Sequence, residues 1–304
     1  MTLSRREFIR SAAVAIGQQV YQSEANLVLV RFSVMKRRNF VTGLSEEDVI
    51  VTENGLEQRI SLFEGPLSTW QERQQVDFRI LVDLSGTTLP FRPLTGELLR
   101  RTLVGTFGQR AVVSIYGFAY DCLKLAGPTQ DAGVIAAGLS RLETVDVRQL
   151  RRAASRIFDS VVQVAGEIDT GPERTHPVLL IFSDGLNSGS RNTLHTAVQS
   201  ALGKAMVVYP VLLANPGERS PRESELIEEY AKLGEQTGGR SFWPAAFTEE
   251  HLSRILTHVV RQVKEEYTVG YYRGSGKSGV GTVRVKLKDR RTGDLKGGVR
   301  LVGQ

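Results

Sequence analysis

Two short stretches of the sequence carry oxygen atoms at a spacing that suits a divalent cation. The first, Asp83-Leu84-Ser85-Gly86-Thr87, follows the apolar run 78–82. A carboxylate followed at two-residue steps by two hydroxyls places three oxygen ligands on one turn, and hard cations such as Mg²⁺ prefer such ligands. The second, Ser183-Asp184-Gly185, ends another apolar run about a hundred residues later. Since open α/β sheets place ligand sites at the carboxyl ends of their strands, we expect both stretches at one edge of a sheet.

The composition predicts a folded globular protein with ordinary proportions of apolar and charged residues. The chain has 304 residues, of which 41% are apolar and 24% charged, enough for one large domain and a smaller one. The net charge is +6, but the basic residues form scattered pairs without interleaved aromatic residues, so we expect no nucleic-acid partner. No run approaches the roughly 18 apolar residues of a membrane span. The single cysteine, Cys122, lies in an apolar run and is predicted to be a buried structural thiol.

The first 20 residues carry a signal that is typical of export. The stretch Ser4-Arg5-Arg6-Glu7-Phe8-Ile9-Arg10 resembles the twin-arginine motif, and an apolar patch follows at 11–17. We therefore expect residues 1–20 to be a leader that directs the protein to the periplasm or cell envelope. If the leader is not functional, the expected location is the cytoplasm.

Residues 21–68 are predicted to form a small β segment. Apolar and polar residues alternate over 27–34, Asn39 to Gly43 is typical of a turn, and 49–51 is a short β-branched run. Asn54-Gly55 is a strong hairpin signal, with 59–63 expected as the return strand. A β segment of this size is too short to bury a core alone.

Residues 76–266 alternate between strand-like and helix-like patterns, which predicts an α/β fold with a doubly wound, mostly parallel sheet. The expected strands are 78–83, 111–118, 122–125, 178–182, 206–213 and 241–243, and the expected helices are 94–107, 131–142, 148–168, 193–203, 222–237 and 249–266. After this domain, residues 267–304 return to strands, at 267–272, 282–287 and 299–302. We expect this C-terminal β segment to pack with 21–68 as one small antiparallel β domain.

The order of several motifs resembles a known family. Three stretches, at 40–48, 53–55 and 60–64, are similar to the entry to the domain in that family. The stretch from Glu266 to Tyr272 is similar to its exit. The chain thus resembles von Willebrand factor A-type domain proteins, in the form found in Acidobacteria. The resemblance covers nearly the whole chain after the leader. It implies a Rossmann-like α/β domain flanked by short β segments.

The resemblance also implies a metal-ion-dependent adhesion site. Carried over to this chain, its ligands are Asp83, Ser85, Thr87, Ser155 and Asp184. Asp83 and Ser85 match the family's first turn directly, and Thr87 stands where a second serine is usual. Ser155, in the segment 154–159, falls at the family's threonine position, and Asp184 matches the third loop. Asp159, in the same segment, is expected to be a structural acid.

Such a site implies binding rather than catalysis. Neutral hydroxyl ligands leave a divalent cation electron-poor, so it takes an Asp or Glu carboxylate from a partner protein to complete its coordination. The expected ion is Mg²⁺, with Mn²⁺ or Ca²⁺ as alternatives. We therefore predict a non-enzymatic, metal-dependent protein-binding module.

Two other functions remain open from the sequence. The glycines that precede the threonine in the family are absent before Ser155, which leaves a degenerate scaffold that binds no metal as the main alternative. The first motif also lies one residue away from the Asp-x-Asp-Gly-Thr of haloacid-dehalogenase-like phosphatases. In those enzymes the second Asp is the general acid and base, and Ser85 cannot replace it.

Overall fold

The computed structural model describes residues 27–37, 39–66, 75–106, 111–145, 154–169, 175–213, 220–244, 246, 248–274 and 279–302, without the side chains of 102–106. The leader expected at 1–20 lies outside these residues. Among the described residues, no helix combines the length and apolar character needed to cross a membrane.

The centre of the protein is a five-stranded sheet in the order β10-β9-β6-β7-β8. Its strands are β6 (Gln75–Asp83), β7 (Ala111–Phe118), β8 (Cys122–Thr129), β9 (Thr175–Ser183) and β10 (Val207–Leu212). Four of them are parallel, and β8 returns antiparallel to β7 as the expected hairpin. The strands that follow β6 in the chain, β7 and β8, lie on one side of it, and the later strands β9 and β10 lie on the other side. The strand order therefore reverses between β6 and β9.

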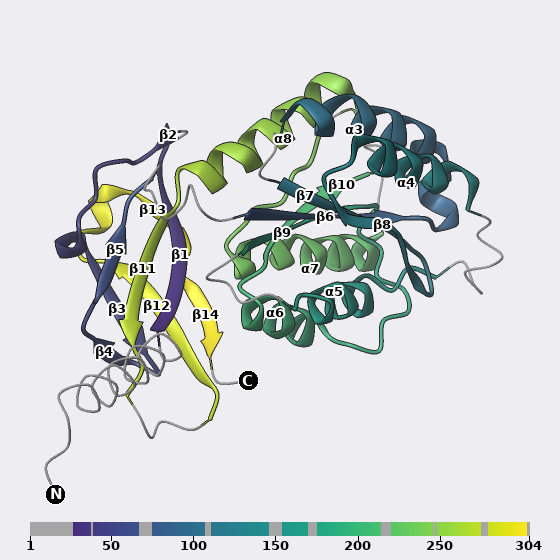
Figure 1. Cartoon of the computed structure of the whole chain (residues 1–304). Helices are drawn as coiled ribbons and strands as arrows, with labels where there is room; N and C mark the ends of the chain where they lie inside the picture. The colour runs from purple at the N-terminus through teal and green to yellow at the C-terminus, as the bar shows by residue number, and fades with distance from the viewer. Residues whose placement is uncertain are drawn as a thin grey trace, which may run out of the picture.

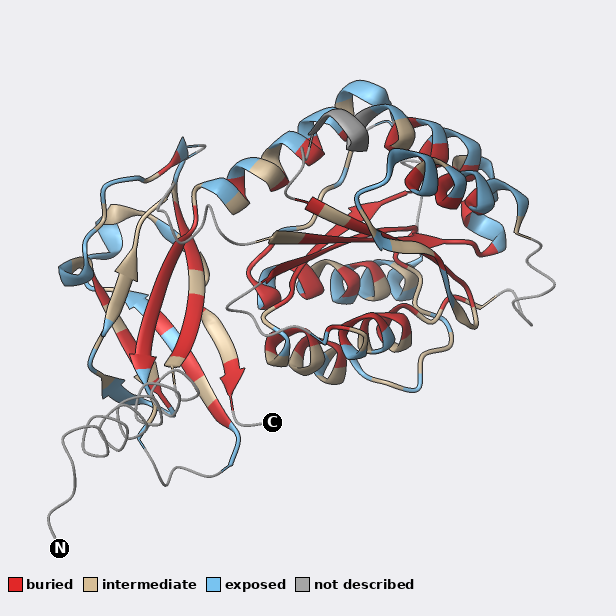
Figure 2. Cartoon of the chain, in the orientation of Figure 1, coloured by how far each residue is buried: buried red, intermediate tan, exposed pale blue. Residues whose placement is uncertain are grey.

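Helices cover both faces of this sheet (Figure 1). One face carries α3 (Arg92–Thr106), α4 (Ala132–Thr144) and α8 (Glu249–Lys264), and the other carries α5 (Ile157–Gly166), α6 (Leu194–Gly203) and α7 (Pro221–Thr237). Side chains of β6 alternate between the two cores, with Ile80 facing α3, α4 and α8 and Leu81 facing α5, α6 and α7. Each helix is buried only along the side that faces the sheet (Figure 2).

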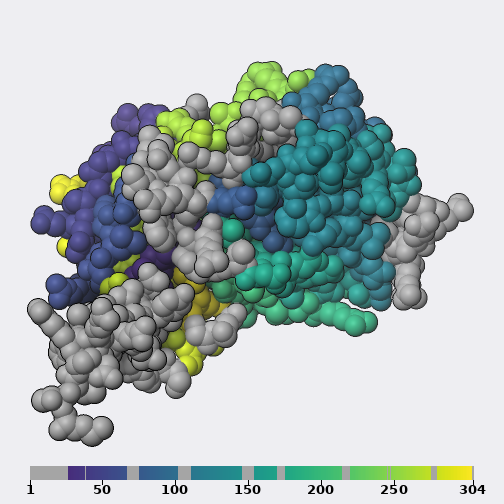
Figure 3. Space-filling model, in the orientation of Figure 1, coloured from purple at the N-terminus to yellow at the C-terminus, as the bar shows by residue number. Residues whose placement is uncertain are grey.

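The two ends of the chain together build a β-sandwich. One sheet has the order β13-β1-β11-β5 with β2 beside β1, and the other has the order β14-β12-β3-β4. Its strands are β1 (Leu27–Lys36), β2 (Asn39–Phe40), β3 (Val49–Glu53), β4 (Leu56–Gln58), β5 (Leu62–Glu64), β11 (Tyr267–Tyr272), β12 (Gly281–Leu287), β13 (Asp294–Gly297) and β14 (Val299–Val302). All pairs are antiparallel. Figure 3 shows these first and last parts of the chain, in purple and yellow, gathered at one end of the molecule.

The sandwich core contains residues from both ends of the chain. Phe32 of β1 stacks on Tyr267 of β11 with ring centroids 5.3 Å apart, and both are fully or almost fully buried. Leu301 of β14 belongs to the core beneath α5, α6 and α7, so the sandwich also packs against the α/β domain.

Four of the expected elements differ from the structure. The strand expected at 241–243 is reduced to a single bridge, between Phe242 and Val211. The return strand expected at 59–63 is wrong: the Asn54-Gly55 turn leads directly into β4, and β5 crosses to the other sheet to pair with β11. The turn expected at 39–43 includes β2, which pairs with β1. The helix expected at 148–168 begins only at Ile157, because the amide of Arg156 donates to the carbonyl of Ala119, 2.8 Å away, instead of continuing a helix. The part at 146–153 lies outside the described residues.

Cys122 begins β8 and is half-buried. Burial, with the charge of Glu167 acting in the same direction, raises the pKa of its thiol to about 12. A thiol that stays protonated is a poor nucleophile, in keeping with a structural role.

A close approach of two glycines joins the sandwich to the α/β domain. Gly238 ends α7 in the left-handed region with φ of 95°, and a Cβ atom added there would lie 2.5 Å from Cα of Gly297 at the end of β13. We expect Gly238→Ala to lower the free energy of unfolding by about 1–3 kcal/mol, because it strains the backbone and separates the two glycines. Urea denaturation measures this change. Gly166→Ala is the matched control, since its added Cβ meets no atom within 4 Å; an equal loss in both variants would contradict the prediction.

A buried pair of titratable groups lies at the same junction. Nε2 of His176 and Oε2 of Glu266 are 3.3 Å apart. Burial lowers the pKa of His176 well below its usual value, helped by the charge of Arg31. Burial raises the pKa of Glu266 to about 8, and the charge of Arg31 acts in the opposite direction. Both groups are therefore neutral at pH 7.

This pair makes stability depend on pH. The folded protein keeps a proton on Glu266 up to about pH 8, whereas the unfolded chain releases it near the ordinary glutamate pKa of 4.5. His176 opposes this effect below its ordinary pKa of 6.5, because the unfolded chain there binds a proton that the folded protein does not. Stability should therefore fall clearly as pH rises from about 6.5 to 8, by up to about 1.4 kcal/mol per pH unit. Glu266→Gln should flatten the slope in urea denaturation across this range, and Glu265→Gln should keep it. A slope that survives in Glu266→Gln would refute this assignment.

Candidate metal site

The two acidic stretches meet where the strand order reverses, between β6 and β9. Asp83 is the last residue of β6, and Asp184 follows the last residue of β9. Eight register pairs hold these two strands parallel, up to Val82 opposite Phe182, so their carboxyl ends stay side by side. Ligands of open α/β sheets bind at this kind of reversal point.

Asp83 lies fully buried at the centre of the site. The amide of Ser85 donates to its Oδ1 at 2.8 Å, the hydroxyl of Ser155 to its Oδ2 at 2.9 Å, and the hydroxyl of Ser183 to the same oxygen at 2.7 Å. These donors come from three separate segments of the chain. The carboxylate therefore ties the ends of β6 and β9 to the loop before α5.

Asp184 and Thr87 complete the cluster. The hydroxyl of Thr87 donates to Oδ2 of Asp184 in a short hydrogen bond and lies 3.2 Å from the hydroxyl of Ser85. The amide of Leu186 donates to Oδ1 of Asp184 at 2.9 Å. All five oxygen ligands named from the sequence thus lie in one connected cluster, and their role in holding a metal stays a prediction.

The electrostatics of the cluster disfavour two negative charges without a counter-ion. Burial raises the pKa of Asp83 to about 6, and the charge of Asp184 adds to this effect, while donation from Ser183 and Ser85 opposes it. The buried guanidinium of Arg92 lies beside the cluster and donates to the carbonyls of Leu84 and Ser85. Burial lowers the pKa of Arg92, and the charge of Asp83 acts in the opposite direction.

Two backbone turns, after Asp83 and after Asp184, orient the side chains of the cluster. The residues after Asp83 enter a short 3-10 helix, η2 (Gly86–Phe91), and the hydroxyl of Thr88 donates to the carbonyls of Asp83 and Ser85 at 2.8 and 3.0 Å. Gly185 has φ of 81°, and an added Cβ would lie 3.0 Å from Cδ1 of Tyr230. The hydrogen bonds of Thr88 therefore fix the first turn, and packing against Tyr230 fixes the second.

The Ser155 loop is held by the loop after β9. The amide of Ser155 donates to the hydroxyl of Ser188 at 3.1 Å, and the amide of Ser188 returns a bond to the carbonyl of Ser155 at 3.0 Å. The amide of Ile157 donates to Oδ1 of Asn187 at 3.1 Å. Ser155 is accordingly buried and belongs to a loop, although the helix expected at 148–168 would have included it.

Several supporting residues were not among the ligands expected from the sequence: Ser183, Thr88, Arg92, Asn187 and Ser188. Ser183 gave a signal, because it is the one polar residue between an apolar strand and Asp184. The small polar residues after Gly185 were a weaker signal for a loop that caps other segments.

Comparisons with known proteins place the fold. No protein-family model matches the chain, and no curated protein matches it. Among solved structures, the chain is similar to the conserved hypothetical protein BatB from Bacteroides thetaiotaomicron, with 18% identity and a TM-score of 0.50 over 62% of this chain and 99% of that one. This chain shares its α/β fold with BatB; at this identity the likeness concerns the fold alone.

Two further solved structures are similar. An aerotolerance-related membrane protein from Bacteroides fragilis matches with 15% identity and a TM-score of 0.48 over 62% of this chain and 98% of that one. A von Willebrand factor type A protein from Catenulispora acidiphila matches with 11% identity and a TM-score of 0.49 over 90% of this chain and 73% of that one. The neighbours thus include a member of the family that the sequence motifs resemble.

Asp159 ties the first turn of α5 to the loop after β9 without entering the site. Its Oδ1 accepts from the amides of Arg191 and Asn192 at 3.0 and 2.8 Å and from Nδ2 of Asn192 at 2.9 Å. We expect Asp159→Ala to cost about 2–3 kcal/mol in urea denaturation, since it leaves these donors unpaired. Asp169→Ala removes an exposed carboxylate just beyond α5 and should change stability by less than about 0.5 kcal/mol. Equal stability of the two variants would contradict an anchoring role.

Proposed function

We propose that this protein is a non-enzymatic binding module that captures an Asp or Glu carboxylate of a partner protein through a divalent cation, Mg²⁺ first. The ligands would be Asp83, Ser85, Thr87, Ser155 and Asp184. The proposal is supported above all by their convergence: five side chains from three segments form one hydrogen-bonded cluster at the reversal point of the sheet. The likeness in fold to solved structures is compatible with a binding module but does not supply the function.

The donor set fits a hard cation. The cluster offers only carboxylate and hydroxyl oxygens, which suit Mg²⁺, Mn²⁺ or Ca²⁺ rather than metals that prefer nitrogen or sulfur. No group of three or more His, Cys, Asp or Glu side chains with metal-binding geometry occurs in the described part of the chain, so two acids and three hydroxyls are the set to be tested. A bound cation would supply a Lewis-acidic position open to an outside carboxylate.

The environment of Asp83 favours binding over covalent catalysis. A nucleophilic carboxylate has to reach the substrate with a free oxygen. Asp83 is fully buried, and both of its oxygens accept hydrogen bonds from within the protein. Ser85 stands where a phosphatase of the haloacid-dehalogenase type has its second acid, and its hydroxyl cannot act as a general acid near neutral pH.

Apolar side chains beside the cluster offer a surface for the partner. Leu89 of η2 is 54% exposed and Leu94 of α3 is 37% exposed, and both follow closely on the turn that carries Ser85 and Thr87. Exposed apolar residues of this size beside a charged site are common at protein interfaces. We propose that they contact the partner around the captured carboxylate.

We also propose that the protein works outside the cytoplasm, in the periplasm or cell envelope. The support is the twin-arginine-like stretch at 4–10.

Cation titration by calorimetry tests the site directly. We expect Mg²⁺ or Mn²⁺ to bind the wild-type protein with one-site stoichiometry, and Asp184→Ala to weaken binding at least tenfold because it removes one of two carboxylates. Asp121→Asn is the matched control, since Asp121 lies in the β7–β8 hairpin outside the cluster. Identical titrations of wild type and Asp184→Ala would favour the scaffold that binds no metal. Capture of a partner from envelope extract should then be lost when EDTA is added.

A further inference from the structure

A short segment extends the central sheet beyond β10. Phe242 forms a parallel bridge with Val211: its amide donates to the carbonyl of Pro210 at 2.8 Å, and its carbonyl accepts from the amide of Leu212 at 2.9 Å. Both polar groups of Phe242 therefore face β10. In extended backbone the amides and carbonyls of the two neighbours, Ser241 and Trp243, must point the opposite way.

These outward groups leave an open edge. Among the described residues, no backbone hydrogen bond reaches the amide or carbonyl of Ser241 or Trp243. An unpaired edge of this kind is a template for another strand. The edge is short, since Pro244 follows it without an amide hydrogen.

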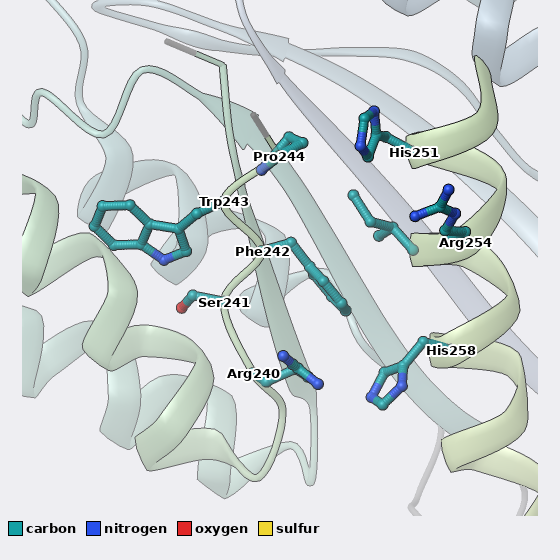
Figure 4. A pocket seen from close by; sticks show the side chains of 9 residues that line it. Arg240, Ser241, Phe242, Trp243, Pro244, His251, Arg254 and His258 are labelled. Carbon is teal, nitrogen blue, oxygen red and sulfur yellow. The ribbon is translucent and has the colours of Figure 1, made fainter. Parts of the chain in front are cut away.

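Two hollows lie beside the edge, and Arg240, Ser241 and Trp243 line both of them. Arg240 and Phe242 face α8 across a groove of about 410 Å³, which His251, Arg254 and His258 also line (Figure 4). The second hollow, of about 730 Å³, reaches Glu235 of α7, Gln262 of α8 and the sandwich strand β13. In Figure 4, Phe242 points toward α8 and Trp243 points away from it. Successive side chains of an added strand would likewise point alternately toward α8 and away from it.

The groove against α8 is positively charged. Arg240 is exposed and lies over the ring of Phe242 at 5.2 Å, and no carboxylate pairs with it among the described residues. Arg254 pairs with Glu250 one turn earlier on the same helix. Arg240 and Arg261 act together with burial to lower the pKa of His258 to about 4. An acidic side chain in this groove would meet an unneutralised guanidinium.

The second hollow presents an aromatic surface. Trp243 is 51% exposed, and in Figure 4 its ring points away from the groove that Arg240 and Phe242 line. Exposed tryptophan is enriched among the residues that dominate binding at protein interfaces.

We infer that the 241–243 edge binds an extended, acidic segment of a partner protein by strand addition. The backbone of the segment pairs with Ser241 and Trp243, an acidic side chain enters the groove beside Arg240, and the next side chain packs on Trp243. Main-chain bonds supply affinity in this mode and alternate pockets supply specificity. The surface shares no residue with the cation cluster, so it works without a metal.

A capped peptide of seven alternating valine and glutamate residues is the probe, titrated by calorimetry in EDTA. We expect one-to-one binding, no binding of a valine–lysine peptide, and at least tenfold weaker binding to Arg240→Gln. Arg284→Gln, which removes an exposed arginine from β12 of the sandwich, should bind within twofold of wild type. Amide hydrogen exchange by NMR should slow at Ser241 and Trp243 when the peptide binds.

Each remaining outcome decides against strand addition. Equal binding to Arg240→Gln and wild type, or unchanged exchange at Ser241 and Trp243, would overturn it. Binding that free glutamate reproduces would mean an anion pocket only, and a dimer that occupies the edge would mean that a second copy of this chain is the partner. Asp184→Ala should bind the peptide as wild type does, so failure of the cation site and failure of this edge are distinguishable.

Discussion

The buried carboxylate of Asp83 is the constraint on which the rest of the site depends. A carboxylate without access to water is costly unless donors in the protein replace its hydration. Here those donors are the amide of Ser85 and the hydroxyls of Ser155 and Ser183. Each belongs to a different segment, so satisfying one acid fixes three loops relative to one another. The geometry of the cluster is therefore set by folding, before any ligand arrives.

Charge supports the proposal that the cluster captures an outside carboxylate. The two acids of the site share their surroundings with the buried guanidinium of Arg92, whose pKa responds to the charge of Asp83. When both acids are ionised, one negative charge remains after this guanidinium is counted. A divalent cation would convert that into one positive charge in a poorly hydrated place, where an additional anionic ligand is strongly stabilised. With fewer carboxylates in the cluster, the bound cation would attract the outside carboxylate more strongly, and with more carboxylates it would attract it less.

The sequence predicted those parts of the site that depend on local pattern. Asp83 and Asp184 each follow a continuous apolar run, and a polar residue at the end of a buried strand can be recognised without tertiary information. The start of α5 could not be recognised in this way. The expected helix at 148–168 continued through Ser155, but hydrogen bonds to Ala119, Asn187 and Ser188 hold residues 155–157 outside the helix or at its start. Those partners are distant in sequence, so the helical periodicity of residues 148–168 could not indicate them.

The strands of the sandwich show the same limit of sequence-based prediction: a strand can be recognised, but the strand that it pairs with cannot. Asn54-Gly55 fixes a hairpin and therefore places its return strand immediately afterwards, at β4. The next strand, β5, joins the other sheet because β11 offers it a partner from the far end of the chain. Alternation specifies that a segment is a strand and which of its faces is buried, but it leaves the identity of its neighbour undetermined.

The sandwich also bears on how the two proposed surfaces can act together. Its strand β14 packs on α6 through Leu301, and β13 meets the end of α7 at Gly238 and Gly297. The 241–243 edge follows α7 directly, and its second hollow is bordered by β13. The cation cluster, by contrast, is held by loops at the carboxyl ends of β6 and β9 and by no residue of the sandwich. A change in the packing of the sandwich against α7 would therefore alter the 241–243 edge and leave the cation cluster intact. The two surfaces thus have separate structural supports.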